Sequence, residues 1–149
     1  MNSLQKGFTL IEVLLSVVII GMLVGLSLPL FQSFQVRNDL DITTQSLADA
    51  LRRAQTYARD GNGDSMWSVS IQSGAGMFYL YKGATFASRD SSYDESTTLQ
   101  GNITGVSGLS DISFAKLTGT PLTTGTITLT TGNNEVRTVT INAKGMVSY

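Results

Sequence analysis

The chain has 149 residues, of which 42% are hydrophobic, and a formal net charge of −1 at pH 7. This length fits one domain with an appendage, because domains usually contain about 100 to 150 residues. A nearly neutral chain lacks the excess of Lys and Arg expected of a nucleic-acid-binding domain. It contains no Cys and no His, which excludes disulfides, thiolate nucleophiles, imidazole bases and the common zinc sites. We therefore expect no enzyme activity and no cofactor.

The first long segment, residues 8–31, is almost entirely apolar, and Glu12 is its one charge. It is longer than the ~20 residues that cross a bilayer as a helix. A secretory signal peptide is the alternative, because Lys6 supplies a basic start. Its apolar region, however, usually spans only about 7 to 15 residues. We predict a single transmembrane helix over 8–31.

An amphipathic helix is predicted for residues 32–60. Small or apolar residues recur at helical period along one side: Leu40, Thr44, Leu47, Leu51, Ala54 and Ala58. The opposite side is charged: Arg37, Asp39, Asp41, Asp49, Arg52, Arg53 and Arg59. The two segments together form one helix of about 50 residues. Because proline removes a helical N–H and clashes with the preceding turn, we expect a kink or local melting from Gly25 to Pro29.

The remainder, residues 61–149, is predicted to be a β-rich globular domain after a Gly-rich turn. A hairpin is expected from 67–71 and 78–81, and a C-terminal meander from 126–131, 136–141 and 146–149. Between them, 83–125 reads as loops around short strands near 97–103 and 112–114. The fold class is therefore α+β: a long N-terminal helix packed on a small antiparallel β-sheet domain.

Glu12 carries the clearest chemical signal. A charge at the centre of a membrane helix costs at least ~2.5 to 3.5 kcal/mol, so the residue requires a partner or a purpose. Alternatively, because it lies near one end of the apolar segment, its carboxylate reaches the headgroups. The residues alone leave both interpretations open.

Residues 6–12, with the sequence KGFTLIE, resemble the class III signal of type IV pilins and type II secretion pseudopilins. The resemblance implies that residues 1–7 form a leader peptide, which a prepilin peptidase removes by cutting between Gly7 and Phe8 before methylating the new amine of Phe8. It also implies that Glu12 neutralises the N-terminal ammonium of a neighbouring subunit during filament assembly. Pro29 stands where such pilins usually carry a helix-melting proline.

The same resemblance implies a location and partners. Lys6 in a cytoplasmic leader agrees with the positive-inside rule. The chain would span the bacterial inner membrane once, with its C-terminal domain outside the cytoplasm, and would then join a filament in the periplasm or at the cell surface. The implied partners are prepilin peptidase, other pilin or pseudopilin subunits and the membrane itself.

The C-terminal strands are similar to those of the GspH/FimT-like group of minor pilins and pseudopilins in the spacing of these residues: Ile127, Leu129, Gly132, Arg137, Val139, Ile141, Gly145 and Val147. This favours a minor subunit of a type II secretion pseudopilus or type IV pilus. The alternatives are a major pilin and a DNA-binding competence pilin. For DNA, only Arg137 and Lys144 lie nearby, and two cations make a weak phosphate site.

Three further patterns have simpler explanations. Asp60, Asn62 and Asp64 resemble half of a calcium loop, but the chain lacks its later ligands, so we favour a capping turn. Another acidic cluster, Asp90, Asp94 and Glu95, is expected in an exposed loop, and no metal is predicted there. Gly21 and Gly25 have the G-x-x-x-G spacing of helix packing, although glycine is common in membrane helices.

The basic residues Arg52, Arg53 and Arg59 offer a face for DNA or for a neighbour's acids. We favour solvated helix residues, with Asp49 pairing to Arg52 and to Arg53 along the helix.

Overall fold

The computed structural model describes residues 7–100 and 102–149, with the side chains of 26–33 left undescribed. The chain divides into two compact units, the first ending at Gln35 and the second covering Val36–Tyr149. One helix, α1 (Leu10–Arg59), contributes to both and contains 50 residues. The prediction of one long helix is confirmed.

In the first unit, α1 is helical through Pro29, so the expected local melting is wrong. Proline's fixed φ is compatible with a helix, and its missing N–H removes only one bond of the ladder. Of the predicted leader, residues 1–7, the first six residues including Lys6 lie outside the described residues. Among the residues described, no helix has both the length and the apolar character required to cross a membrane.

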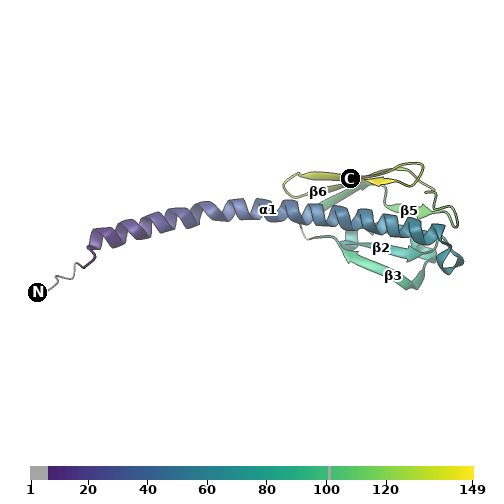
Figure 1. Ribbon diagram of the computed structural model, residues 1–149, viewed down its shortest axis with the longest axis horizontal. Coiled ribbons are helices and arrows are strands. Elements are labelled where there is room, and N and C mark those ends of the chain that lie inside the picture. The colour runs from purple at the N-terminus through teal and green to yellow at the C-terminus, as the bar shows by residue number, and fades with distance from the viewer. Residues whose placement is uncertain (1–6, 101) are drawn as a thin grey trace, which may run out of the picture. The chain divides into compact units, whose positions relative to one another are not determined.

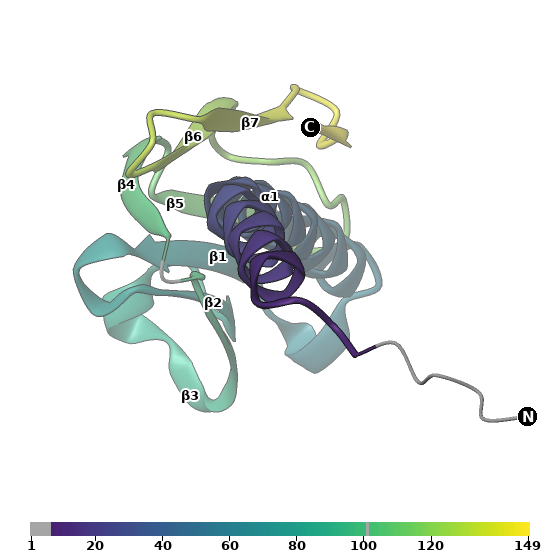
Figure 2. The same ribbon diagram turned by 90° about the vertical axis from the view of Figure 1, so that its left-hand side faces the viewer.

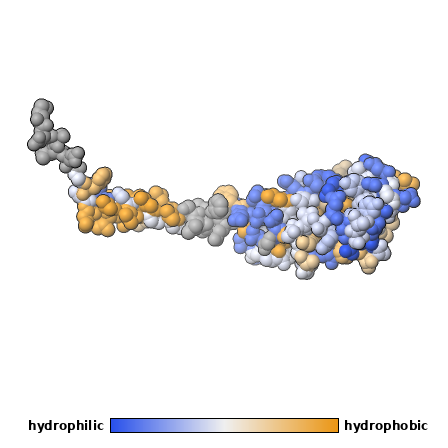
Figure 3. Space-filling view, turned by 90° about the horizontal axis from the view of Figure 1, so that it is seen from below, coloured by the Kyte–Doolittle hydropathy of each residue, from blue (hydrophilic) through white to orange (hydrophobic). Residues whose placement is uncertain are grey.

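The apolar side chains of this first unit are exposed. Phe8 and Leu10 are 82% and 80% exposed, and every large apolar side chain from Ile11 to Val24 is about half exposed or more. Figure 3 shows the described part of this segment as a hydrophobic surface. None of these side chains belongs to the buried core cluster.

The second unit contains two four-stranded antiparallel sheets. Sheet A has the order β3-β2-β1-β5, from β1 (Trp67–Gln72), β2 (Met77–Lys82), β3 (Asp90–Thr98) and β5 (Asp111–Phe114). Sheet B has the order β4-β6-β7-β8, from β4 (Ile103–Gly108), β6 (Gly125–Thr131), β7 (Val136–Ile141) and β8 (Val147–Ser148). Three short 3-10 helices follow α1, β1 and β2: Asn62–Asp64, Ser73–Ala75 and Phe86–Ser88. Figures 1 and 2 show the second half of α1 between the two sheets.

The buried core of this unit joins α1 to both sheets. The predicted apolar stripe is confirmed, because Leu40, Leu47 and Leu51 are each 0% exposed. They belong to one cluster with alternate residues of the strands, such as Val69 in sheet A and Ile127 in sheet B. Burial of this kind stabilises a helix far more than its own propensity does.

The predicted α+β fold is correct, and so are the hairpin β1–β2 and the meander β6–β7–β8. The region 83–125 is where prediction was weakest. It contains β3 and β4, and the strand expected near 97–103 is wrong, because that stretch joins their ends. β3 was not predicted from the sequence, because its side chains are mostly exposed and so lack the apolar alternation typical of a strand.

Candidate functional site

The start of α1 holds the residues predicted to direct processing and assembly. Gly7 and Phe8 precede the helix. The carbonyl of Thr9 accepts hydrogen bonds from the backbone N–H groups of Glu12 (3.1 Å) and Val13 (3.3 Å). Thr9 therefore caps the first turn, and residues 7 and 8 lie outside the helix and are exposed.

Glu12 lies in the first turn of α1 and is exposed. A carboxylate there interacts favourably with the positive end of the helix dipole. The hydroxyl of Ser16 donates to the Glu12 backbone carbonyl oxygen at 2.7 Å. The ion pairs found among the described residues do not include Glu12.

The other predicted residues of this segment give less information. The side chain of Pro29 lies outside the described ones. A Cβ added to Gly21 or Gly25 would meet nothing within 4 Å, so a second helix has open access to both positions.

A set of polar contacts, called the clasp, joins the first turns of α1 in the second unit to sheet B and its loops. These contacts were not predicted from the sequence. Arg37 pairs with Glu135 at 2.8 Å, and the Asn102 amide donates to Asp39 at 2.6 Å. Because 37–41 read as a solvated helix face and its partners lie far along the chain, no sequence signal could identify these contacts.

The last member of the clasp uses one of the two cations considered for DNA. Arg137 forms a 2.8 Å ion pair with Asp41. Lys144 follows β7 in a turn, where its backbone oxygen accepts a 3.1 Å hydrogen bond from Gln55. The structure therefore assigns Arg137 an acidic partner within the chain, and this pairing gives no support to a phosphate site.

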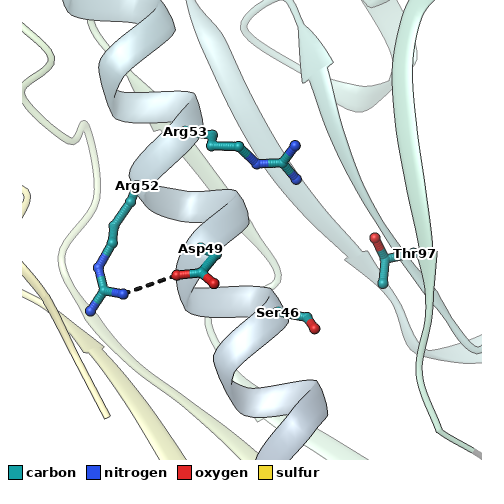
Figure 4. A pocket seen from close by; sticks show the side chains of 5 residues that line it. All are labelled: Ser46, Asp49, Arg52, Arg53 and Thr97. Carbon is teal, nitrogen blue, oxygen red and sulfur yellow. Dashed lines mark hydrogen bonds and ion pairs between the residues drawn. The ribbon is translucent and has the colours of Figure 1, made fainter.

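A polar groove lies between α1 and β3, and Figure 4 shows its lining: Ser46, Asp49, Arg52, Arg53 and Thr97. The predicted pair of Asp49 with Arg52 is present at 3.0 Å. Arg53 pairs with Glu95 of β3 instead of Asp49. Arg52 also donates to the Val147 carbonyl oxygen at 3.2 Å, so both arginines contact the sheets and are more than solvated helix residues.

The two acidic clusters considered for calcium are engaged in ion pairs. Asp64 pairs with Lys116, whose hydrogen bond and charge lower the pKa of Asp64. Asp90, Asp94 and Glu95 lie on β3, not in a loop, and pair with Lys82, Arg89 and Arg53 in turn. Within residues 7–100 and 102–149, no group of three His, Cys, Asp or Glu is placed to hold a metal ion.

Comparisons with known proteins match both parts of the chain. Residues 2–28 match the prokaryotic N-terminal methylation motif. A fimbrial protein of Dichelobacter nodosus is 34% identical over 111 residues, which cover 70% of this chain and 65% of that protein. The type IV major fimbrial protein FimA of the same organism is 36% identical over 61 residues, 41% of this chain and 39% of FimA. The chain thus spans about two fifths of the length of FimA and about two thirds of the length of the fimbrial protein.

The minor pseudopilin EpsH of the type 2 secretion system of Vibrio cholerae has a similar fold, with a TM-score of 0.55 at 15% identity. The similarity covers 74% of this chain and 94% of the EpsH structure. The model of the type II transport protein GspH matches residues 43–145. This range covers α1 from the clasp onward and both sheets, well over half of the chain, and the chain therefore belongs to the type II transport protein GspH family.

Proposed function

We propose that the protein is a structural subunit, of the minor kind, in a type II secretion pseudopilus or a type IV pilus. The observation that carries this proposal is the exposed apolar first half of α1, which begins with a methylation motif and continues into a GspH-family domain. Such a helix needs lipid or other helices around it, because exposed apolar surface is costly in water. The helix of a filament subunit is surrounded by lipid before assembly and by other helices after it.

Processing is the first step of the proposal. Prepilin peptidase would cut between Gly7 and Phe8, which lie outside the helix where a protease can reach the backbone. The new ammonium at Phe8 would then be methylated. Before assembly, residues 8–31 would hold the subunit in the bacterial inner membrane with the two sheets outside the cytoplasm.

Assembly is the second step. The carboxylate of Glu12 would pair with the Phe8 ammonium of a neighbouring subunit when the helix leaves lipid for the filament core. An unpaired charge buried among apolar helices would be strongly unfavourable. The pairing would therefore favour the axial position of each new subunit that brings the two charges together.

Mass spectrometry of the mature protein tests the processing step. We expect the N-terminus to be a methylated Phe8, and the full chain from Met1 to persist in cells lacking prepilin peptidase. Assembled filaments that contain uncleaved Met1 would contradict the proposal. The abundance of the chain in purified filaments separates a minor from a major subunit.

A further inference from the structure

A seven-residue segment, residues 83–89, covers the outer face of sheet A and is called the strap below. The outer face is the side away from the core, because Ser68 and Ser70 alternate along β1 with the core residues Val69 and Ile71. Two carbonyl groups hold the strap down. The Gly83 oxygen accepts from the Ser68 hydroxyl at 2.6 Å, and the next carbonyl, of Ala84, accepts from Ser113 at 2.9 Å.

Phe86 supplies the apolar contact of the strap. Its ring centroid lies 5.1 Å from that of Tyr79 and 5.7 Å from that of Tyr81, both on β2. Phe86 is nevertheless only partly buried, and the 3-10 helix that contains it has no buried residue. The strap's own side chains would therefore lose little buried surface if the strap lifted.

Arg89 fastens the far end of the strap. Its Nε donates to Asp94 Oδ2 at 2.7 Å, and its Nη1 donates to the Phe86 carbonyl oxygen at 2.7 Å. The guanidinium also lies 3.7 Å from the Phe86 ring centroid. One side chain thus joins β3, the strap backbone and the strap's one aromatic ring, and charge-assisted hydrogen bonds of this kind are the stronger ones.

Two polar atoms near this fastening are poorly satisfied. Tyr81 is 0% exposed, and neither its Oη nor Asp94 Oδ1 has a hydrogen-bond partner among the described residues. Burial raises the pKa of Tyr81, only partly opposed by the nearby Ser68. A buried polar atom without a hydrogen-bond partner destabilises the folded state, and a hydrogen bond to water would remove that cost. Opening the strap would let water reach both atoms.

We propose that the strap opens as a local unit while both sheets stay folded, and that Arg89 controls its opening. The strap's own residues are at most partly buried, it is held by a few polar contacts at each end, and two unsatisfied atoms lie near Arg89. Few buried contacts and exposed hydrogen bonds are the features of a low-stability segment. The open form exposes Tyr79 and Tyr81. Opening therefore switches an otherwise covered aromatic face of sheet A to the solvent.

Hydrogen exchange of the full chain in detergent tests this proposal. The Ser88 amide is a suitable reporter, because it donates to the Thr85 carbonyl oxygen in the closed strap. We expect Arg89→Gln to speed its exchange by about tenfold, the effect of losing a charged hydrogen bond. Exchange in β1 and β2 should remain unchanged. Arg53→Gln is the matched control, because Arg53 also pairs with a β3 carboxylate but does not touch the strap.

Tyr81 gives an independent readout. Acetylation of its phenol by N-acetylimidazole should be faster in Arg89→Gln than in Arg53→Gln. Tyr81→Phe keeps the ring and removes the unsatisfied hydroxyl, so it should slow the exchange of Ser88, whereas Tyr79→Phe should not.

Three results would overturn the proposal. One is equal Ser88 exchange in Arg89→Gln and Arg53→Gln. Another is an equal increase of exchange in the strap and in β1–β2 of Arg89→Gln, which would indicate global unfolding. The third, informative even if Arg89→Gln fails to fold, is unchanged or faster Ser88 exchange in Tyr81→Phe.

Discussion

Leu15 and Leu51 are both leucines of α1, yet Leu15 is 61% exposed and Leu51 is 0% exposed. The same contrast holds for the whole helix: the large apolar side chains described before Gly25 face outward, whereas those from Leu40 onward form a stripe against the two sheets. One helix therefore uses apolar residues for two purposes. In the second unit they form the core that stabilises the fold, whereas the large apolar side chains described from Ile11 to Val24 are about half exposed or more.

The difference teaches how to read the apolar pattern. An apolar stripe with a charged opposite side indicates packing against the chain's own domain. A helix that is apolar all round is typical of one surrounded by lipid or by other helices, and residues 13–24 carry no charged side chain. The predictions below test this division in order of decreasing effect.

Glu12→Gln should have the largest effect, because Glu12 is the one charge of the apolar segment. If it pairs with a neighbour's ammonium, its neutralisation should reduce incorporation into filaments at least about tenfold, given that breaking a buried ion pair costs about 3 to 5 kcal/mol. Leader removal and membrane insertion should be normal. Immunoblots of sheared filaments and of membranes measure the two quantities, and normal incorporation would favour the headgroup interpretation.

Leu51→Ala tests the other half of α1. Removing this fully buried side chain should lower the free energy of unfolding by about 2 to 5 kcal/mol, measured by denaturant unfolding of the full chain in detergent. The control is Leu15→Ala, the same substitution on the same helix, which should leave unfolding of the sheets unchanged. Equal destabilisation by both variants would refute the division between the two halves.

Glycines give a second matched pair. Gly108 has a φ of +92°, and a Cβ there would collide with the backbone oxygen of Thr126. Gly108→Ala should therefore cost about 1 to 3 kcal/mol of stability. Gly21→Ala should cost the sheets nothing, because a Cβ at Gly21 meets open space. A stable Gly108→Ala protein would show that the β4–β5 corner can relax.

The smallest effect concerns pH. Lys116 lowers the pKa of Asp64 below its ordinary value, so the folded state holds this proton less tightly than the unfolded state. The resulting stability is present above pH 3.8 and is lost as pH falls through the folded pKa. Asp64→Asn should therefore lower the melting temperature slightly at neutral pH and not at all in strong acid. A difference that persists in acid would assign the effect to something other than ionisation.

Much of the site was predictable, because its signals are local. Residues 7, 8 and 12 lie in a single short stretch of the sequence, and the Leu40–Ala58 stripe follows from the helical period alone. Each property depends on residues within one or two turns of one another. The family match to residues 2–28 falls on the same stretch.

What could not be predicted depends on contacts between distant residues. Arg137 read as a free cation until Asp41, 96 positions away, proved to be its partner. β3 read as a loop because an edge strand with exposed side chains needs no apolar alternation; its pairing with β2 defines it instead.

Periodicity and short motifs specify local structure, so they predicted the long helix, the hairpin and the meander, and they place the proposed processing and assembly residues at the start of that helix. Three features emerge only in the folded chain: the strands form two sheets around the second half of α1, Arg52 and Arg53 of α1 contact those sheets, and Arg89 fastens the strap over sheet A. Those features depend on which surfaces pack together, and packing is decided by the whole chain.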